Sequence, residues 1–517
     1  MRHTQGLQRA AIQEGQTIAT VYRDRKRTYR EVLERVSRFA AALRALGAKP
    51  GDRIAVIAAN SDRYYEAYYA ILWAGCVVVP GNTRWAPAEH AYALRDSEPS
   101  LLLVDRAFEK LGVELEGERS IPVVLLDDAE PGGDLPAQDA LIEAHAPMAD
   151  ACGAGNDLAG IFYTGGTTGK PKGVMLSHFG MISNFQSSAL VRSYPARSIF
   201  LHSPPMFHLA DAASLFGLTP LAATHVIVPG FEPATVIETI QRENVNAVVF
   251  VPTMLNMLDL YLREHPADLS VVETVTYGAS AISEATLKRS MVNFPNAVFA
   301  QAYGQTELSP VATVLTPEFH SEEAAAAGLL RSAGRAVPNV ELRIVDAGLN
   351  EVPTGTVGEV AVRSPGAMLG YWRKPELTAE TIVDGWLRTG DAGYLDGRGF
   401  LFLVDRVKDM IVSGGENVYS AEVENALYQH PAVAECAVIG VPDDRWGERV
   451  HAVVRLRAGM QADDAELTHH CQALIAGYKR PRSYEFRTEP LPLSGAGKIL
   501  KTELRKSFWS EQDRNVG

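Results

Sequence analysis

Segments with the periodicity of a helix alternate with short runs of β-branched residues along most of this chain, and this alternation constrains the fold more than any other feature. Tyr29–Leu46 spaces its apolar residues three and four apart, which predicts an amphipathic helix. Arg53–Ala58 predicts a short strand and Asp62–Gly75 a second helix. Further strands are expected at Val226–Val228, Ala247–Val251 and Thr274–Tyr277, and further helices at Pro233–Glu243 and Ser283–Phe294. This order indicates an α/β fold with mostly parallel sheets flanked by helices.

The later part of the chain has a different residue composition and a different order of expected elements. Gly355–Arg363 and Gly397–Val404 are rich in glycine and β-forming residues, as in small hairpins, and predict a β-rich subdomain. After Asp405 the order of strand, loop and helix resumes. Because 517 residues exceed one ordinary core, we expect an N-terminal domain of residues 1–405 and a small α+β C-terminal domain of residues 406–517.

Charge and cysteine content exclude several classes of protein. The net charge of −13 argues against a nucleic-acid-binding protein, because phosphate backbones favour a basic face. The four cysteines are scattered without a C-x-x-C pair, which fits neither a disulfide framework nor a zinc ribbon and suits a reducing cytosol. No signal-peptide core precedes the charged run 23–30, and the apolar segment Ala70–Pro80 is too short to span a bilayer. We expect a cytoplasmic protein without a transmembrane segment.

The stretch Tyr163–Gly173, with the sequence YTGGTTGKPKG, is the strongest local signal of a ligand site. It follows the apolar run Leu158–Phe162, so a strand is expected to lead into a flexible, hydroxyl-lined and cationic loop. Glycines let backbone N–H groups approach an anion, threonine hydroxyls donate to phosphate oxygens, and lysine supplies charge. The loop is not a Walker P-loop, because Pro171 stands where that motif has Ser or Thr. By itself it is either a polyphosphate site or a ligand-free glycine-rich turn.

Further motifs follow this loop in a definite order. They are Pro205–His208 (PMFH), Tyr277–Ser280 (YGAS), Tyr303–Glu307 (YGQTE), Trp386–Asp391 (WLRTGD), Asp405–Asp409 (DRVKD), Ser413–Asn417 (SGGEN) and Ser494–Lys498 (SGAGK). The series resembles the ANL superfamily of adenylate-forming enzymes, in its acyl-CoA synthetase branch, over nearly the whole chain. The resemblance implies a large N-terminal domain, a small mobile C-terminal domain and a two-step reaction. A carboxylic acid and ATP give an acyl-adenylate and pyrophosphate, and a thiol then displaces AMP.

The resemblance implies that the glycine–threonine loop holds the β- and γ-phosphates of ATP. The hydroxyls of Thr164, Thr167 and Thr168 would donate to them, although the family often has serine where Gly165 stands. Glu307 matches the family's Mg²⁺ ligand, and a hard cation that bridges to phosphates commonly takes only one or two protein carboxylates. Out of context, Glu307 would be an exposed acid at the start of a helix.

The same resemblance places the nucleoside beside two other motifs. Tyr303 would offer a flat face to adenine, and Asp391, with Arg406 nearby, would accept hydrogen bonds from the ribose hydroxyls. Alone, Tyr303 would be ordinary core and Asp391 a turn residue. The expected ATP- and AMP-binding residues are Thr164, Gly165, Gly166, Thr167, Thr168, Lys172, Gly278, Ala279, Ser280, Gln301, Ala302, Tyr303, Gly304, Gln305, Thr306, Asp391 and Arg406.

Three residues are expected to act in catalysis by the same resemblance. Lys498 would contact the acyl carboxylate and the α-phosphate during adenylation, although a lone lysine in a glycine-rich loop is usually solvated surface. Lys408 would be the hinge about which the C-terminal domain rotates between the two steps. His208, beside the acyl site, would shift between the steps. The channel for the CoA thiol is expected at Gly414, Gly415 and Glu416. Lys479 is added to this channel because the basic segment Tyr478–Pro481 could serve the CoA phosphates; docking of the C-terminal domain and a solvated basic turn are the alternatives.

The residues expected to line the acyl pocket are mostly small or apolar, and Ala302 and Gly304 would leave room for a chain or a ring. These residues, carried over from the family, are His208, Phe231, Val251, Thr253, Met254, Gly278, Ala302 and Gly304. No Arg or Lys in these segments could pair a second carboxylate, which favours a fatty acid of medium or long chain or an aryl acid. Asp211 lies near the position where amino-acid-activating relatives pair the substrate amine, but one residue does not settle that alignment.

The function expected from these observations is an AMP-forming acyl-CoA synthetase that uses ATP, Mg²⁺ and coenzyme A. The alternative is a free-standing adenylation enzyme that loads an acyl or aminoacyl group onto a carrier protein. Luciferase-like oxidation fits less well because nothing in the sequence indicates oxygen chemistry. A nucleotide-binding regulator without catalysis fits less well because Lys498, Glu307 and Lys408 occur together. The expected partners are small molecules and no nucleic acid, and a homodimer is left open.

Overall fold

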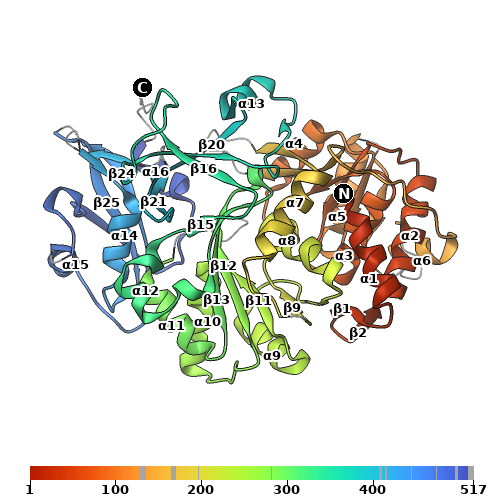
Figure 1. Cartoon of the computed structure of the whole chain (residues 1–517), viewed down its shortest axis with the longest axis horizontal. Coiled ribbons are helices and arrows are strands. Elements are labelled where there is room, and N and C mark those ends of the chain that lie inside the picture. The colour runs from red at the N-terminus through yellow and green to blue at the C-terminus, as the bar shows by residue number, and fades with distance from the viewer. Residues whose placement is uncertain are drawn as a thin grey trace.

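The computed structural model describes residues 1–119, 121–127, 135–164, 171–195, 197–280, 282–406, 410–413, 416–443, 445–472, 474–494 and 499–509. The larger part of the molecule runs from the N-terminus to the cyan elements, and the blue C-terminal elements form a smaller part at one end (Figure 1). None of the described helices combines the length and the apolar character needed to cross a membrane.

Nine of the described strands form one sheet in the larger part. In spatial order they are β15 (Arg335–Ala336), β14 (Val311–Leu315), β13 (Val298–Gly304), β12 (Thr274–Gly278), β11 (Ala247–Phe250), β9 (Ile199–His202), β10 (Thr224–Ile227), β1 (Ile18–Tyr22) and β2 (Arg25–Thr28). The strands from β13 to β1 are parallel to one another, and β14, β15 and β2 extend the two edges antiparallel. Parallel strands end at the same edge, so β12 and β13 bring their carboxyl ends together.

A second sheet contains seven of the described strands and carries the glycine–threonine loop. In spatial order they are β18 (Gly370–Tyr371), β8 (Lys172–Ser177), β7 (Leu158–Thr164), β4 (Val77–Pro80), β3 (Arg53–Ile57), β5 (Leu101–Val104) and β6 (Val123–Leu125). Strands β7, β4, β3, β5 and β6 are parallel, whereas β8 and β18 pair antiparallel. The loop therefore connects an antiparallel pair at one side of a parallel sheet.

Helices cover both sheets and fill the space between them. They are α1 (His3–Gln13), α2 (Tyr29–Ala45), α3 (Asp62–Trp73), α4 (Pro87–Ser97), α5 (Glu109–Arg119), α6 (Gln138–Ala144), α7 (His178–Ala189), α8 (Leu209–Leu218), α9 (Pro233–Glu243), α10 (Pro252–Glu264), α11 (Glu284–Asn293) and α12 (Glu322–Ala326). All twelve residues of α3 are buried, because one apolar cluster joins α2, α3 and α8 to strands of both sheets. A helix buried on every side belongs in the core of a large domain.

Local sequence signals explain where these helices begin. Thr28 and Glu31 form a capping box at the start of α2, and Ser283 accepts a hydrogen bond from the backbone of Thr286 at the start of α11. The prediction for α9 is confirmed in both bounds, and those for α2 and α11 are confirmed to within one residue at each end. The predicted α/β class is confirmed.

A small antiparallel sheet makes the expected β-rich subdomain. It contains β16 (Glu341–Val345), β17 (Gly358–Arg363), β20 (Trp386–Leu395), β19 (Ile382–Val383) and β21 (Leu401–Arg406), with α13 (Pro375–Thr381) before β19. The two segments that predicted hairpins become β17 and β21, which both pair with β20. This pairing sets Asp391 directly opposite Arg406.

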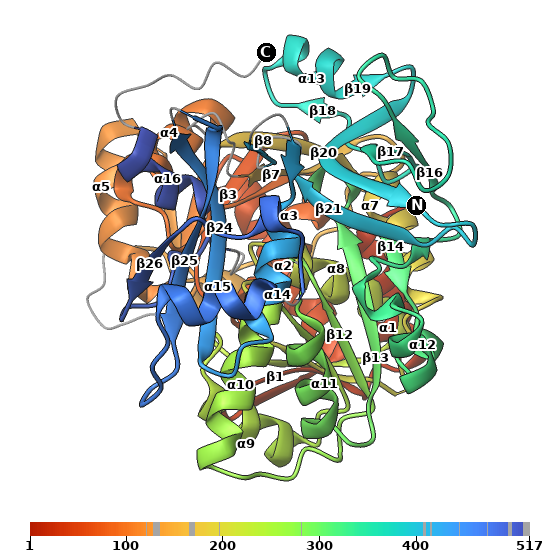
Figure 2. The ribbon, with the colours of Figure 1, turned by 90° about the vertical axis from the view of Figure 1, so that its left-hand side faces the viewer.

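The C-terminal part has a sheet and a buried core of its own. Its elements are β22 (Ile411–Ser413), β23 (Glu416–Val418), α14 (Ser420–Tyr428), β24 (Val433–Asp443), β25 (Gly447–Leu456), α15 (Asp464–Gln472), β26 (Ser483–Arg487) and α16 (Lys501–Trp509). Figure 2 faces this part and shows α14, α15 and α16 around β24, β25 and β26. The expected α+β character is confirmed, and the boundary at residue 405 stays a prediction.

Candidate functional site

Two predicted phosphate ligands stand at the ends of the glycine–threonine loop. Thr164 ends β7 and Lys172 begins β8, and the two residues pair directly across the antiparallel ladder. Both side chains are partly buried. Four other predicted members of this loop, Gly165, Gly166, Thr167 and Thr168, lie outside the described residues. The described part therefore fixes where the loop leaves and rejoins the sheet.

The predicted adenosine residues gather at the carboxyl ends of β12 and β13. Gly278 ends β12 and pairs with Ala302 of β13. A Cβ atom at Gly278 would lie 2.1 Å from the carbonyl oxygen of Ala302, so the close approach of the two strands requires glycine. Gly304 ends β13 with a φ of +156°, and its added Cβ would lie 2.0 Å from the carbonyl oxygen of Pro310. Seven other predicted members follow in the same segments and are Ala279, Ser280, Gln301, Ala302, Tyr303, Gln305 and Thr306.

Tyr303 and Asp391 are in direct contact, although 88 residues separate them. The Tyr303 hydroxyl donates a hydrogen bond of 2.7 Å to Oδ2 of Asp391. Gln301 lies two residues before Tyr303 and shares its face of β13, and Oε1 of Gln301 is buried without a partner among the described residues. An aromatic face, a carboxylate and an unsatisfied acceptor fit the ring, the hydroxyls and an amino group of a nucleoside. The backbone of Arg406 lies opposite Asp391, and its side chain is outside the described set.

The predicted metal ligand lies next to this group. Glu307 is the middle residue of the short 3₁₀ helix η3 (Thr306–Leu308), and 9% of its surface is exposed. The hydroxyl of Tyr371 donates to Oε1 of Glu307 at 2.9 Å. No three described His, Cys, Asp or Glu side chains cluster in a way that could hold a metal by themselves. A single carboxylate suits Mg²⁺ that takes its remaining ligands from phosphates and water.

His208 caps a helix beside the apolar core. It precedes α8, where its Nδ1 accepts a hydrogen bond of 3.2 Å from the backbone N–H of Ala210. Asp211, one turn further, is fully buried, and its Oδ2 lies 2.8 Å from Nδ1 of His202. Nε2 of His202 in turn lies 2.9 Å from Nδ1 of His225. Burial raises the pKa of Asp211 and lowers that of His225 far below its usual value. Asp211 is therefore engaged inside the fold.

The predicted acyl-pocket residues from the middle of the chain belong to one apolar cluster. Val251 and Met254, at the start of α10, are buried in it, and Phe231 packs edge-on against Phe250 with ring centroids 6.0 Å apart. Thr253, which lies between Val251 and Met254 in the sequence, is partly buried. Their companions Gly278, Ala302 and Gly304 lie at the strand ends described above. The assignment of these residues to an acyl pocket stays a prediction.

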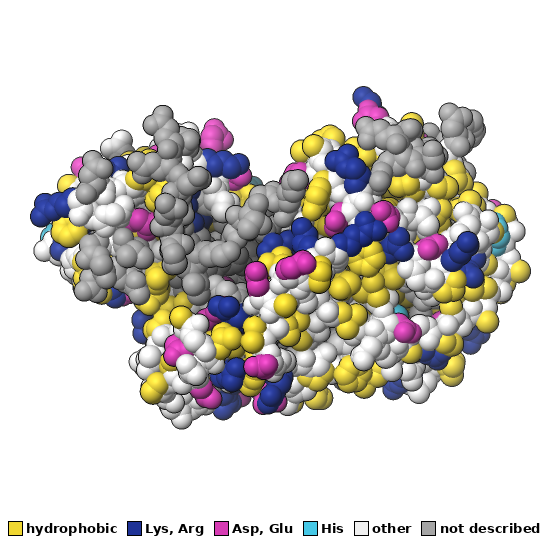
Figure 3. All heavy atoms as spheres, turned by 90° about the horizontal axis from the view of Figure 1, so that it is seen from above, with side chains coloured by type: hydrophobic (Ala, Val, Ile, Leu, Met, Phe, Trp, Pro, Cys, Tyr) yellow, Lys and Arg dark blue, Asp and Glu magenta, His cyan; other side chains and the backbone are white. Residues whose placement is uncertain are grey.

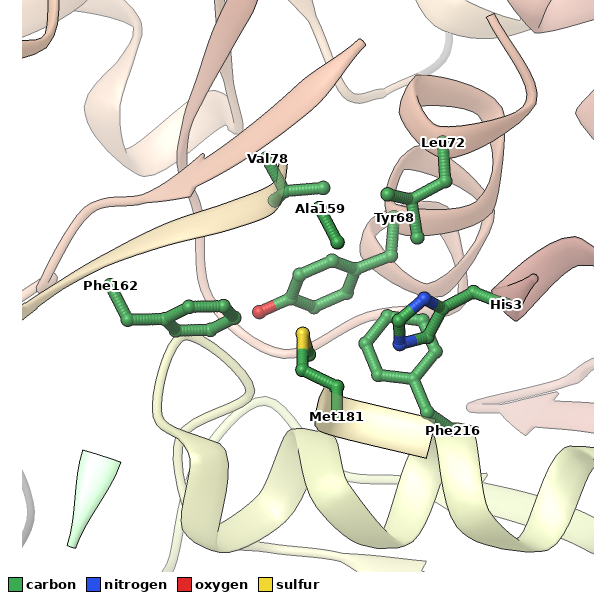
Figure 4. A pocket seen from close by; sticks show the side chains of 8 residues that line it. All are labelled: His3, Tyr68, Leu72, Val78, Ala159, Phe162, Met181 and Phe216. Atoms are coloured by element: carbon green, nitrogen blue, oxygen red, sulfur yellow. The ribbon is translucent and has the colours of Figure 1, made fainter. Parts of the chain in front are cut away.

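Two gaps in the packing lie elsewhere in the larger part. Figure 4 shows the first, where His3, Tyr68, Met181 and Phe216 face one another with other apolar side chains, and it has no room for a water molecule. The second lies among Trp85, His90, Tyr163 and strands of the seven-stranded sheet. Neither gap is lined by a predicted acyl-pocket residue.

A hydrogen bond between Arg84 and Ser494 joins the C-terminal part to the larger part. Nη1 of Arg84 donates a hydrogen bond of 2.9 Å to the carbonyl oxygen of Ser494, 410 residues later. From above, the surface is indented between the two parts, and a row of Lys and Arg side chains lies beside the indentation (Figure 3). Lys498, Lys408, Gly414 and Gly415 lie outside the described residues, as does the side chain of Glu416.

Lys479, expected in the CoA channel, already has an acidic partner. Nζ of Lys479 lies 2.7 Å from Oε1 of Glu422. The pKa of Lys479 is raised: burial acts to lower the pKa, but the hydrogen bond to Glu422 and the charge of Glu422 act to raise it and prevail. The ion pair joins Lys479 to α14 within the C-terminal part. A role toward CoA phosphates would require this ion pair to open or to share its cation.

Tyr371 and Arg84 were not among the predicted site residues. Each contacts its partner across a large sequence separation, 64 residues for Tyr371 and Glu307. The short segment Gly370–Tyr371 carries no periodic pattern, so only its pairing with β8 brings it to the site. No signal in the sequence alone would have connected these pairs.

Two family models match this chain, and the similar known proteins include ligases, synthases and synthetases. Residues 7–372 match the AMP-binding enzyme family, and residues 422–498 match the AMP-binding enzyme C-terminal domain. A feruloyl-CoA synthase of Amycolatopsis is 38% identical over 93% of this chain and 94% of that protein. A fatty acid–[acyl-carrier-protein] ligase of Streptomyces coeruleorubidus is 35% identical over 98% and 96%, respectively. The solved o-succinylbenzoate CoA synthetase of Bacillus subtilis, in complex with its acyl-adenylate intermediate, has a TM-score of 0.84, 29% identity and 99% coverage of both chains.

Proposed function

The chain belongs to the AMP-binding enzyme family, in the acyl-CoA synthetase branch of the ANL superfamily, and on this premise we propose how its residues perform the reaction of an AMP-forming acid–thiol ligase. In the first step a carboxylate oxygen attacks the α-phosphorus of ATP, and the bond to pyrophosphate breaks. In the second step the thiol sulfur attacks the acyl carbon, the bond to AMP breaks and the thiol proton is released. Positioning and charge neutralisation supply most of the rate enhancement for attack at phosphorus.

The observation that carries the proposal is the hydrogen bond between Tyr303 and Asp391. Tyr303 lies at the carboxyl end of β13, four residues before Glu307. We assign Tyr303 to the adenine, Asp391 to the ribose hydroxyls, and Thr164 and Lys172 to the phosphates. Glu307 would hold Mg²⁺, which neutralises charge on the phosphates when bound. These residues come from three sheets and from η3, and two sets of contacts link them: Tyr303 with Asp391, and Tyr371 with both Glu307 and Lys172. They supply the aromatic face, the acceptor, the cation and the metal ligand that ATP requires.

The acid is proposed to be a fatty acid of medium or long chain or an aryl acid. None of the residues proposed as pocket walls is an Arg or Lys that could pair a second carboxylate. Asp211 is fully buried, its Oδ2 is held by His202 and its Oδ1 has no partner among the described residues, so a substrate amine would have to enter the packed core to pair with it. Both features favour an acid with an apolar body. The names of the feruloyl-CoA synthase and of the fatty acid ligase fit the same two classes.

The acceptor is proposed to be coenzyme A. Among the similar proteins, a feruloyl-CoA synthase and the o-succinylbenzoate CoA synthetase carry CoA in their names. The alternative acceptor is a carrier protein, because one relative is named a fatty acid–[acyl-carrier-protein] ligase. The two differ in whether a free pantetheine thiol or a protein must reach the acyl-adenylate.

Pyrophosphate release separates these possibilities. The purified enzyme would be incubated with ATP, Mg²⁺ and a panel of fatty, hydroxycinnamic and arylacetic acids, with no acceptor, with CoA, or with an acyl-carrier protein. We expect a single-turnover burst without acceptor and continuous release with CoA for one class of acid. Continuous release only with the carrier protein would favour the alternative, and no release with any acid would contradict the proposed function.

The cellular setting is also part of the proposal. The four cysteines are free, and Cys76, Cys436 and Cys471 are buried, which suits a reducing compartment such as the cytoplasm. A homodimer is a further hypothesis, which light scattering on the purified protein tests directly.

A further inference from the structure

Tyr371 stands between the proposed phosphate lysine and the proposed metal ligand. It is the second residue of β18, which pairs antiparallel with β8 and sets Tyr371 opposite Val174, two residues after Lys172. Its side chain is buried, with 7% of its surface exposed. The hydroxyl donates to Oε1 of Glu307 at 2.9 Å, and Nζ of Lys172 lies 5.4 Å from the ring centroid. One side chain thus contacts a carboxylate with its edge and an ammonium group with its face.

Both contacts are physically favourable at a buried position. A carboxylate that loses water needs hydrogen-bond donors, and the Tyr371 hydroxyl supplies one to Glu307. An aromatic face attracts a cation within about 6 Å.

The geometry fixes which oxygen of Glu307 is engaged. The hydrogen bond from Tyr371 goes to Oε1, and the backbone carbonyl of Glu307 accepts from the N–H of Met368, three residues before Tyr371. The segment that carries Tyr371 therefore holds both the backbone and the carboxylate of Glu307. A carboxylate held in this way presents Oε2 to a cation without first searching its rotamers.

We propose that Tyr371 is a positioning residue for the metal–triphosphate complex, with its hydroxyl orienting Glu307 for Mg²⁺ and its ring orienting Lys172 for the phosphates. This inference rests on the proposed function. Residues that orient metal ligands through hydrogen bonds typically contribute tenfold to a hundredfold in metal affinity. The hydroxyl and the ring have separable effects, because one substitution removes the first and another removes both.

The test compares Tyr371→Phe with Tyr29→Phe. Tyr29 offers a matched control, because its buried hydroxyl also donates a hydrogen bond, to the carbonyl oxygen of Ala223 at 2.5 Å, and it belongs to none of the proposed binding segments. Free Mn²⁺ would be measured by electron paramagnetic resonance during titration of enzyme and ATP with MnCl₂. We expect Tyr371→Phe to weaken Mn²⁺ binding to the enzyme–ATP complex about tenfold. Tyr29→Phe should leave this binding unchanged.

A second variant separates the role of the ring. Tyr371→Leu removes the aromatic face as well, so it should also weaken ATP binding measured by calorimetry in EDTA, whereas Tyr371→Phe should not. Phenylalanine keeps the ring volume, so Tyr371→Phe remains informative if Tyr371→Leu does not fold. Wild-type affinity for Mn²⁺ in folded Tyr371→Phe would overturn the inference. Failure of the wild-type enzyme to release pyrophosphate with any acid would instead overturn the proposed function.

Discussion

Single residues at the ends of β12 and β13 are set by steric limits that a small substitution can test. Gly278→Ala would place a Cβ 2.1 Å from the carbonyl oxygen of Ala302, which belongs to the backbone and cannot rotate away. We expect a loss of about 1–3 kcal/mol in the free energy of unfolding, as for other overpacked positions. Gly230→Ala is the control, because no atom lies within 4 Å of its added Cβ. Thermal unfolding of both variants measures the difference, and equal melting temperatures would contradict the steric account.

The predicted role of Lys498 is also tested at the level of one residue. Lys498→Ala should abolish the release of pyrophosphate but spare thioester formation from acyl-adenylate supplied ready-made, because the lysine is assigned only to the first step. Lys506→Ala is the matched control, since Lys506 is exposed and pairs with Glu503 on α16. Each half-reaction would be followed separately. Equal losses in both half-reactions would show that the assignment of Lys498 is wrong.

How far a site can be predicted from sequence depends on how its residues are brought together. Glu307 and Asp391 could be assigned because each lies within a contiguous motif. Tyr371 could not, because its contact with Glu307 depends on the pairing of a two-residue strand with β8. The hydrogen bond between Tyr303 and Asp391 likewise joins two motifs, and neither motif alone indicates that the other lies nearby. Contiguous motifs therefore indicate which side chains are chemically suited to a site, whereas the contacts between those side chains depend on the pairing of segments far apart in the sequence.

At the scale of elements, periodicity predicts helices and central strands well and short edge strands poorly. Helix α9 has a regular apolar face, and β11 is an uninterrupted apolar run, so both could be located closely. Strands β15, β18 and β19 have two residues each, which is too short for any period to appear. These three short strands are recognised only by their pairing with β14, β8 and β20.

Buried histidines within the elements predict a specific dependence of stability on pH. Burial lowers the pKa values of His90 in α4, His178 in α7 and His320 after the short helix η4 (Pro317–Phe319) to about 4. The unfolded chain, with histidine near 6.5, binds more protons than the folded one between these values. Stability should therefore be complete above about pH 6.5 and fall as the pH drops toward 4. The melting temperature measured across this range tests the direction.

His90→Leu isolates one of these groups. Nε2 of His90 is buried without a partner among the described residues, so leucine removes a titrating group without breaking a bond at that nitrogen. Between pH 6.5 and 4, the free energy of unfolding of His90→Leu should change less steeply with pH than that of the wild type. The difference in slope should be up to about 1.4 kcal/mol per pH unit. Urea unfolding at several pH values gives this slope. An unchanged slope would show that His90 protonates freely in the folded protein.

For the whole molecule, the contact between the two parts bears on the proposed reaction. The seven-stranded, nine-stranded and small antiparallel sheets carry the described members of the proposed nucleotide site, and the C-terminal part has its own core and joins the larger part after β21. The sequence could predict that a second part exists, because its strand and helix pattern restarts after Asp405. It could not predict which surface the second part rests on, because that contact involves single side chains such as Arg84.

The contact of Arg84 with Ser494 gives a prediction about the division between the two half-reactions. Ser494 lies four residues before Lys498, so the hydrogen bond holds the start of the Lys498 loop against the larger part. If the C-terminal part rotates between the steps, this bond belongs to the arrangement that performs adenylation. Arg84→Ala should then slow pyrophosphate release about fivefold to tenfold, in line with the loss of about 1 kcal/mol for one hydrogen bond.

The same variant should leave thioester formation from supplied acyl-adenylate at the wild-type rate or faster, since that step does not use the contact. Arg9→Ala is the matched control, because Arg9 also donates to a backbone carbonyl, that of Pro220, but within the larger part. Its two half-reactions should keep the wild-type ratio. A matching loss of both half-reactions in Arg84→Ala would mean that Arg84 supports the fold as a whole, because a contact made in only one arrangement of the two parts must change the balance between the steps.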